Sequence, residues 1–160
     1  MKNKEEKTNV MRLLEQKKIP HQCHFYNDTD AVAGMDVAAV LGENPDRVFK
    51  TLVTVGKTGL HYVFIMPVNK ELDLKKAASA VGEKNIEMIK SKDLLPLTGY
   101  IHGGCSPIGM KKPFTTVLHE SALAFDTIMY SGGKIGFQVE TAPRELEKFV
   151  KISYKDIVCG

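Results

Sequence analysis

Residues 48–66 read VFKTLVTVGKTGLHYVFIM, and this stretch indicates the fold most directly. Two runs rich in β-branched and aromatic residues, Val48–Val55 and Leu60–Met66, flank the turn sequence GKTG. Such a pattern is typical of a β-hairpin. The hairpin stands between segments of helical periodicity, so strands and helices are intermixed without strict β-α alternation. This order predicts a mixed sheet with flanking helices in the α/β class.

The remaining elements follow from periodicity and from capping residues. The first expected helix is capped by Thr8 and turns Val10, Leu13 and Leu14 inward, and the second contains Val37, Val40 and Leu41 and ends at Gly42. The third is capped by Asp73, turns Leu74, Ala77, Ala78 and Val81 inward and ends at Gly82. A short helix is expected over Ser91–Leu97, and a last one begins at Pro143 and continues through Leu146, Phe149 and Val150. The expected additional strands are His24–Tyr26, Ile86–Ile89, Thr115–Leu118, Thr127–Tyr130 and Ile135–Val139.

The composition is that of an ordinary soluble protein, with 160 residues, 43% of them hydrophobic and 26% charged. This length indicates a single domain over residues 1–160. No apolar run is as long as a membrane span, and the first ten residues, MKNKEEKTNV, contain no signal-peptide core, so we expect a cytoplasmic protein that does not engage membranes. A net charge of +3 permits contact with nucleic acid without requiring it.

Lys50 is the candidate functional side chain of the hairpin. Alternation places it on the same strand face as Val48 and Leu52, and both faces of this strand are largely apolar. The lysine is therefore either a desolvated group in a pocket or an edge-strand lysine that blocks aggregation.

Two glycine-rich segments are the candidate ligand-binding loops. Residues 99–112 read GYIHGGCSPIGMKK, and residues 131–136 read SGGKIG. Glycine suits positions where the backbone adopts positive φ or where another molecule comes close, and exposed amides can hold the polar atoms of a ligand. Residues 99–112 are equally compatible with a long turn between two strands. For residues 131–136 alone, a hairpin turn is the favoured interpretation. The two segments, each with a nearby serine, could also converge on one ligand.

Two functional interpretations of the cysteines, as a nucleophile and as a metal ligand, have little support. Cys105 lies between Gly104 and Ser106 but has no histidine partner defined by the sequence, which favours a small turn residue over a nucleophile. Cys23 with its neighbouring histidines lacks a fourth metal ligand at a suitable spacing, and no CxxC pattern exists. We therefore expect no metal, no cofactor and no protein nucleophile.

The order of the motifs resembles that of the YbaK/EbsC family. The residues that carry the resemblance are Tyr26, the run RVFKTL from Arg47 to Leu52, the run GYIHGGCSPIG from Gly99 to Gly109, and the triplet Ser131-Gly132-Gly133. The resemblance covers nearly the whole chain. It implies a single domain with a mostly antiparallel, barrel-like mixed sheet and flanking helices, related to the editing domain of bacterial prolyl-tRNA synthetase.

The resemblance also implies the activity and the site. The activity would be removal of cysteine from mischarged Cys-tRNA(Pro), or also Cys-tRNA(Cys), by attack of the substrate's own thiol on its ester carbonyl, with release of a cyclic thioester. Lys50 would be the catalytic residue. The substrate-binding residues would be Tyr26, Thr51, Gly103, Gly104, Ser106, Ser131, Gly132 and Gly133.

The implied partners are the aminoacyl 3′ end of mischarged tRNA and prolyl-tRNA synthetase. If the synthetase holds the tRNA, a weak basic surface is sufficient, and the pairs Lys17-Lys18, Lys75-Lys76 and Lys111-Lys112 are candidates for it. Two alternatives stay open: a water-dependent Ala-tRNA(Pro) deacylase, and a module that binds the aminoacyl end without cleaving it. One departure concerns specificity, because relatives often carry a bulky residue where this chain reads AVAG at residues 31–34.

Overall fold

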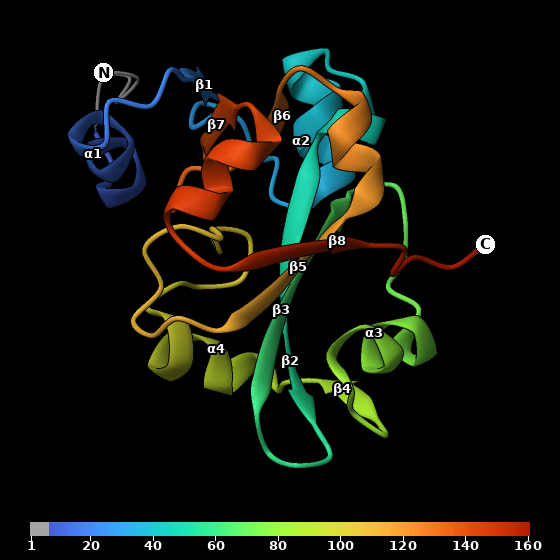
Figure 1. Ribbon diagram of the computed structural model, residues 1–160. Helices are drawn as coiled ribbons and strands as arrows, with labels where there is room; N and C mark the ends of the chain where they lie inside the picture. Colours follow the sequence, from blue (N-terminus) through green and yellow to red (C-terminus); the bar gives the residue numbers. More distant parts are fainter. Residues whose placement is uncertain (1–6) are drawn as a thin grey trace.

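The computed structural model describes residues 7–160 (Figure 1). Residues 1–6, which begin the charged N-terminal stretch, lie outside the described residues. The helices are α1 (Asn9–Gln16), α2 (Gly34–Leu41), α3 (Leu74–Val81) and α4 (Ser91–Thr98), with 3₁₀ helices η1 (Pro45–Arg47), η2 (Glu120–Ala124) and η3 (Pro143–Lys148). The strands are β1 (Gln22–Phe25), β2 (Phe49–Gly56), β3 (His61–Pro67), β4 (Ile86–Met88), β5 (Thr115–His119), β6 (Ile128–Ser131), β7 (Phe137–Thr141) and β8 (Ile152–Lys155).

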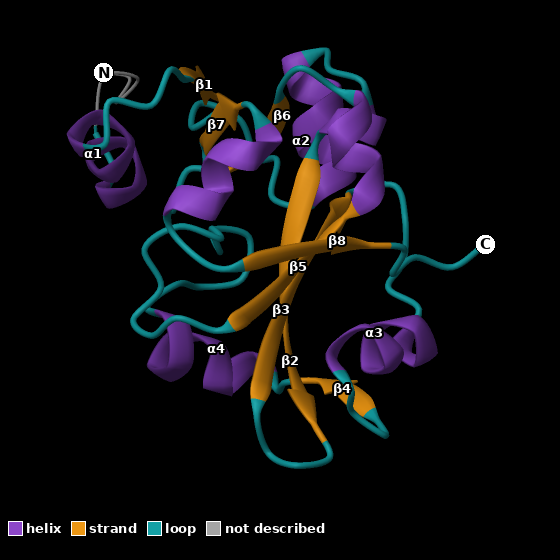
Figure 2. Ribbon diagram, viewed as in Figure 1, coloured by secondary structure: helices purple, strands orange, loops and turns teal. Residues whose placement is uncertain are grey.

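The strands form two sheets. The larger has the order β4-β2-β3-β5-β8, and the smaller has the order β1-β7-β6. All pairs are antiparallel except β3 with β5 and β5 with β8. A parallel bridge between Val48 and Met129 connects the two sheets. The expected mixed, mostly antiparallel arrangement with flanking helices is confirmed, with the strands divided between two sheets (Figure 2).

The expected hairpin lies in the middle of the larger sheet. β2 and β3 pair from Phe49 with Pro67 to Val55 with His61, and Val53 lies opposite Val63. On β3, Phe64 packs with Ala77 of α3 on one face, whereas Ile65 belongs to the core shared with α1 and the smaller sheet. Apolar layers on both faces of β3 explain its continuous hydrophobic run. In Figure 1, α3 and α4 lie to either side of this hairpin.

The predicted helix ends are confirmed by their capping geometry. The Thr8 hydroxyl accepts a hydrogen bond from the Met11 amide at 3.3 Å, and the Asp73 carboxylate accepts from two amides of the first turn of α3. Gly42 and Gly82 end α2 and α3 with φ of +66° and +77°. These are left-handed values that favour glycine at a helix C-terminus.

Three expectations need correction. Leu74 is 44% exposed instead of inward, because it is the first residue of α3 and projects beyond the core that the later residues contact. The segment opened by Pro143 forms the 3₁₀ helix η3 and not an α-helix. β8 was not expected, because four residues, three half-buried and one exposed, carry little local signal, and only the parallel pairing with the distant β5 makes them a strand.

Within residues 7–160, no helix combines the length and apolar character needed to cross a bilayer.

Candidate functional site

A cavity of about 300 Å³ lies where the start of β2, the N-terminal end of α2, the glycine-rich loop after α4 and the smaller sheet meet. Its size is at the lower end of the range for small-molecule sites. Apolar side chains such as Phe49 and Val37 form much of the wall. Lys50, Thr51 and Gln138 bring polar groups to it. The cavity therefore suits a small ligand with a few polar atoms.

Lys50 lines this cavity, which confirms the interpretation that its side chain points into a pocket. Burial lowers the pKa of Lys50 below its ordinary value, and the charge of Glu71 offsets only part of this effect. Desolvation has this effect because a partly dehydrated ammonium group is less stable than one in water. The site thus holds a lysine whose charge is only partly compensated by the protein.

Three cavity-lining residues carry buried polar atoms without a hydrogen-bond partner: Tyr26 Oη, Thr51 Oγ1 and Gln138 Oε1. Leaving a buried polar group unpaired costs about 1–3 kcal/mol, so native proteins rarely do so without a reason. Their concentration in one cavity, beside Lys50, indicates polar groups kept ready for a bound molecule.

The two glycine-rich segments converge, which is one of the two arrangements compatible with the sequence. A Cβ on Gly103, where φ is +88°, would lie 2.7 Å from Val32 Cγ1 and 3.3 Å from Ile135 Cγ1. A Cβ on Gly104 would lie 3.2 Å from both Ile135 N and Lys134 Cα. These two glycines allow the loop after α4 to lie directly against the β6–β7 turn at the edge of the cavity.

The residues implied by the family resemblance fall into two groups. Lys50, Tyr26, Thr51, Gly103 and Ser131 line the cavity. The others, Gly104, Ser106, Gly132 and Gly133, are not among the lining residues.

The residues of this second group stabilise the two turns that carry the lining residues. Ser106 is fully buried, and its hydroxyl accepts a hydrogen bond from the Ile108 amide at 3.3 Å. The Gly133 amide donates to Ser131 Oγ at 3.0 Å. Gly132 allows close packing against Phe137, since a Cβ there would lie 3.2 Å from that residue's carbonyl oxygen. These contacts shape the two turns.

Cys105 also lines the cavity, but its chemistry is that of a buried thiol. Burial raises the pKa of Cys105 to about 12. Because the thiolate and not the thiol is the nucleophile, this side chain is unreactive at neutral pH. The interpretation of Cys105 as a small packing residue is consistent with this.

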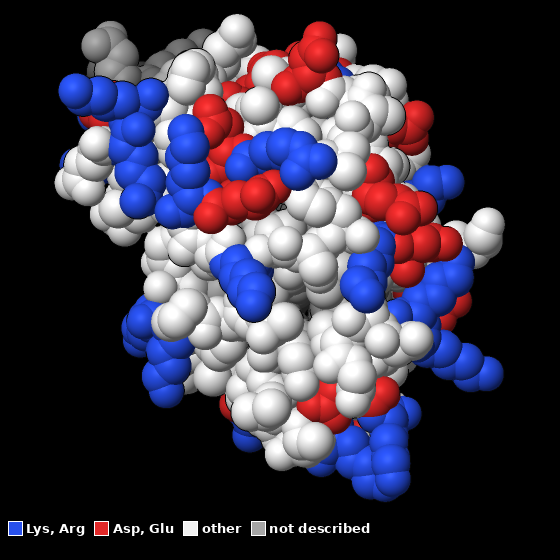
Figure 3. All heavy atoms as spheres, in the orientation of Figure 1, with Lys and Arg blue, Asp and Glu red and all other residues white. Residues whose placement is uncertain are grey.

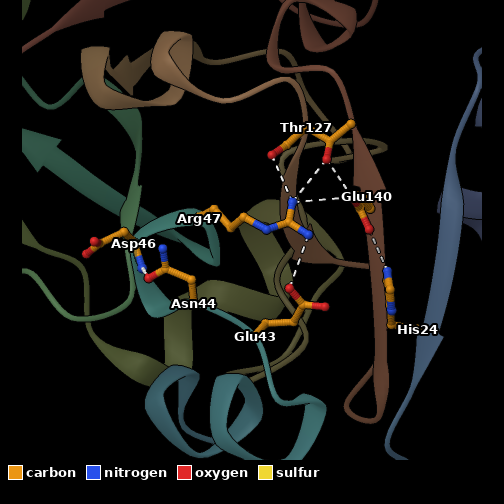
Figure 4. A network of polar contacts seen from close by, with 7 residues as sticks. All are labelled: His24, Glu43, Asn44, Asp46, Arg47, Thr127 and Glu140. Atoms are coloured by element: carbon orange, nitrogen blue, oxygen red, sulfur yellow. Dashed lines mark hydrogen bonds and ion pairs between the residues drawn. The ribbon is translucent and has the colours of Figure 1, made fainter.

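A partly buried polar network fixes the start of β2 (Figure 4). Arg47, three residues before Lys50, donates through Nη1 to the Thr127 carbonyl at 3.0 Å and to Glu140 Oε2 at 3.3 Å. Its Nη2 donates to Glu43 Oε1 at 3.1 Å. On the other side, His24 Nε2 lies 2.7 Å from Glu140 Oε1. The network thereby ties the segment that leads into Lys50 to the smaller sheet.

Burial by itself would raise the pKa of Glu140, which is only 9% exposed. Hydrogen bonds from Thr127 and His24 and the charge of Arg47 outweigh this effect and hold the pKa of Glu140 below its usual value. Glu140 is therefore an ionised carboxylate at neutral pH. Among residues 7–160, no group of three or more His, Cys, Asp or Glu side chains is placed to hold a metal ion.

Comparison with known proteins identifies the family. Residues 29–149 match the model of the aminoacyl-tRNA editing domain. The chain belongs to this family. The protein of Enterococcus faecalis (strain ATCC 700802 / V583) named "Putative Cys-tRNA(Pro)/Cys-tRNA(Cys) deacylase EbsC" is 46% identical over 157 residues, which cover 98% of this editing domain protein and 96% of the relative.

Two further relatives extend the comparison. A proline--tRNA ligase of Pelobacter propionicus is 35% identical over 82 residues, which cover 51% of this chain and 14% of the ligase. The crystal structure described as "a putative trans-editing enzyme for prolyl tRNA synthetase" superposes with a TM-score of 0.80 at 24% identity, covering 94% of this chain and 95% of that one. At this identity, the superposition shows a shared fold.

Some lining residues of the editing domain were not singled out as site residues from the sequence. Gln138 is the foremost of them, and the only available signal was a polar residue between the apolar Phe137 and Val139. Val32, Ala33 and Gly34 at the start of α2 line the cavity, where the sequence analysis noted only a departure from the family. The group also includes His102 and Leu94, together with the apolar residues Val37, Val48, Phe49, Leu52 and Val68.

Proposed function

We propose that this editing domain protein removes cysteine from mischarged Cys-tRNA(Pro), and also from Cys-tRNA(Cys), as a trans-acting deacylase. The relative that matches along nearly its whole length carries that activity in its name. The observation that carries the proposal is the composition of the cavity. Lys50 stands among unpartnered polar atoms, while Cys105, the lining thiol, is held in its unreactive form.

The proposed reaction takes its nucleophile from the substrate. The cysteine sulfur attacks the carbonyl carbon of the ester that links it to the terminal ribose. The new C–S bond closes a cyclic thioester, the C–O bond to the ribose breaks, and the thiol proton ends on the ribose oxygen. A thiol held against its own carbonyl reacts with the advantage of an intramolecular group. No protein nucleophile is required.

Each polar group of the cavity has a proposed role in this reaction. The Lys50 ammonium stabilises the negative charge that develops on the carbonyl oxygen, an effect strengthened by its partial desolvation. Gln138 Oε1 and Tyr26 Oη, both unpartnered acceptors, bind the substrate's α-ammonium group. Thr51 Oγ1 and the Gly103 amide orient the ester. These assignments are consistent with a cavity that accepts one small amino acid.

The proposal includes the wider setting. Residues 1–160 act as one deacylase domain in the cytoplasm, where tRNA is charged. Prolyl-tRNA synthetase is the proposed partner, in line with the partial match to a proline--tRNA ligase.

The decisive experiment follows release of the amino acid from tRNA(Pro) charged separately with cysteine, serine and alanine. We expect fast release of cysteine only. Serine is nearly the same size as cysteine and provides the matched control for the thiol, because a cavity alone discriminates such isosteres weakly. Faster release of alanine would replace the proposal with a water-dependent Ala-tRNA(Pro) deacylase. If stoichiometric protein releases nothing, the site is a binding module.

The Lys50→Ala variant tests the role of the lysine. We expect release of cysteine to slow by about 100-fold or more, the usual cost of removing one transition-state donor. Lys57→Ala, at the exposed hairpin turn, is the control and should behave as the wild type. Retained activity in Lys50→Ala would refute the catalytic assignment, provided that thermal unfolding shows both variants to be folded.

A further inference from the structure

Residues 90–112 form a basic segment of the chain. Residues 90–112 contain Lys90, Lys92, Lys111 and Lys112 against the single acid Asp93, which gives a formal net charge of +3. The whole chain has 22 basic and 19 acidic residues, so the remainder contains 18 of each and is neutral. This neutrality holds only for the sum, because residues 1–18 also carry a net charge of +3, with six basic and three acidic residues. A localised basic surface indicates a polyanionic partner.

The four lysines gather at the two ends of α4. Lys90 is the N-cap residue of α4, and Lys92 lies in its first turn. Lys111 returns to the other end, where its amide donates to the Thr98 carbonyl at 3.1 Å and its side chain packs beside Gly99. Lys112 follows directly. We call the surface formed by these four lysines the α4 corner.

Local stability does not explain the basic residues at the start of α4. The N-terminal end of a helix carries partial positive charge and favours acidic residues and hydrogen-bonding caps. Lys90 makes no side-chain capping bond to α4, and Lys92 adds a second positive charge to a first turn that has one acidic residue, Asp93. A local conflict of this kind is expected where function sets the residue type.

The charges of the α4 corner are also not neutralised by the protein. None of its four lysines forms an ion pair with another residue of the described range 7–160. By contrast, Lys76 of the pair Lys75-Lys76 binds the Asp156 carboxylate at 2.9 Å and the Val158 carbonyl. Figure 3 shows basic side chains over the lower left edge of the molecule, where α4 lies in Figure 1.

The α4 corner is continuous with the cavity. Leu94 of α4 lines the cavity, and so do His102 and Gly103 of the loop that joins α4 to Lys111. The same helix and loop thus contribute lining residues to the proposed active site and carry the exposed lysines. A chain that enters the cavity from this direction passes the α4 corner.

We propose that the α4 corner binds the phosphate backbone of the single-stranded 3′ end of tRNA as its aminoacylated terminus enters the cavity. The inference rests on the proposed function for the identity of the polyanion. Of the three candidate pairs named from the sequence, the proposal selects Lys111-Lys112 and adds Lys90 and Lys92. The contact is independent of base sequence, because lysine ammonium groups bind phosphates as point charges.

The test measures binding of uncharged tRNA(Pro) by fluorescence anisotropy over a series of salt concentrations. The variant replaces all four lysines of the α4 corner with alanine. Each phosphate contact on a single strand contributes about 0.7 to the slope of log affinity against log salt. We therefore expect the slope to become shallower by about 2–3 and the affinity at low salt to fall at least 10-fold.

A matched variant replaces four other exposed lysines, Lys57, Lys75, Lys84 and Lys155, with alanine and loses the same net charge. We expect it to retain most of the slope and affinity of the wild type. An unchanged slope in the α4-corner variant, or an equal loss in the matched variant, overturns the proposal. Thermal unfolding of both variants shows whether they are folded.

A small substrate separates this proposal from the proposed function. Cysteinyl-adenosine carries the reacting ester without the tRNA phosphates, so the α4-corner variant should cleave it at the wild-type rate while losing activity on Cys-tRNA(Pro). Slower cleavage of cysteinyl-adenosine would place the lysines in the reaction itself and overturn the docking role. If the wild type cleaves neither substrate but the salt slope depends on the α4 corner, the proposed function fails and the binding surface stands.

Discussion

Lys50 illustrates, at the scale of a single residue, how a site conflicts with local stability. Desolvation of this half-buried side chain lowers the pKa of Lys50, because burial makes the ammonium form less stable than it is in water. Its neighbours Tyr26, Thr51 and Gln138 add unpaired polar atoms to the same cavity. A packed apolar cluster would be more stable here. Strain of this kind is expected where a ligand provides the missing partners.

Cys105 gives a prediction at the same scale. Because burial raises the pKa of its thiol to about 12, we expect Cys105→Ala to keep deacylation within about threefold of the wild type. Alkylation with iodoacetamide at pH 8, followed by mass spectrometry, should modify the exposed Cys159 well before Cys105. A 100-fold loss of activity in a folded Cys105→Ala variant would instead indicate that Cys105 acts as a nucleophile.

At the scale of elements, the cavity depends on close approach between segments. Gly103 and Gly104 allow the loop after α4 to meet the β6–β7 turn. Gly34, the first residue of α2, likewise allows this helix to lie close to Val68. A Cβ on Gly34 would lie only 2.4 Å from Val68 Cγ1. The missing bulk at the start of α2 is therefore also a packing requirement.

Gly34→Ala distinguishes packing from helix propensity. Propensity alone predicts stabilisation, by up to about 1 kcal/mol, because alanine is a better helix former. The clash with Val68 predicts the opposite, a loss of about 1–3 kcal/mol of unfolding free energy, as is usual for overpacking. Urea unfolding measures the sign. The double variant with Val68→Ala should lose less unfolding free energy than the two single variants lose together. A neutral or stabilising Gly34→Ala would contradict the expectation.

At the scale of the whole molecule, two contacts connect the sheets near the site. The Val48–Met129 bridge joins them directly, and one residue earlier Arg47 reaches Glu140 of the smaller sheet. The main core also spans both sheets, with Phe49 and Tyr130 in one cluster. Because Lys50 follows this junction, the relative position of the two sheets sets the position of its side chain.

Glu140→Gln should weaken this junction in a pH-dependent way. The folded-state pKa of Glu140 is below its unfolded value, so its ionised form stabilises the fold above the ordinary glutamate pKa of about 4.3. We expect the variant to lose about 1–3 kcal/mol at pH 7. The difference from the wild type should shrink as the pH falls through the folded-state pKa. Chemical unfolding from pH 7 to pH 3 measures it, and a constant difference would argue against a role for the charge.

Most elements of the fold could be predicted because their signals are local. The hairpin over residues 48–66, the caps at Thr8 and Asp73 and the terminating glycines depend on spacing within one turn or one strand. β8 depends on a partner distant in the sequence, so periodicity could not reveal it. For the same reason, the division of the strands between two sheets was not foreseen.

The sequence by itself determined that Lys50 lies on a strand with apolar surroundings and that two glycine-rich turns flank later strands. Only the tertiary structure decided that these turns meet, that Gly104 and Gly132 support the wall instead of lining it, and that Gln138 faces the cavity without a partner. The physical reason is that backbone conformation and alternation are local properties. Burial, desolvation and unpaired polar atoms exist only where distant segments come together.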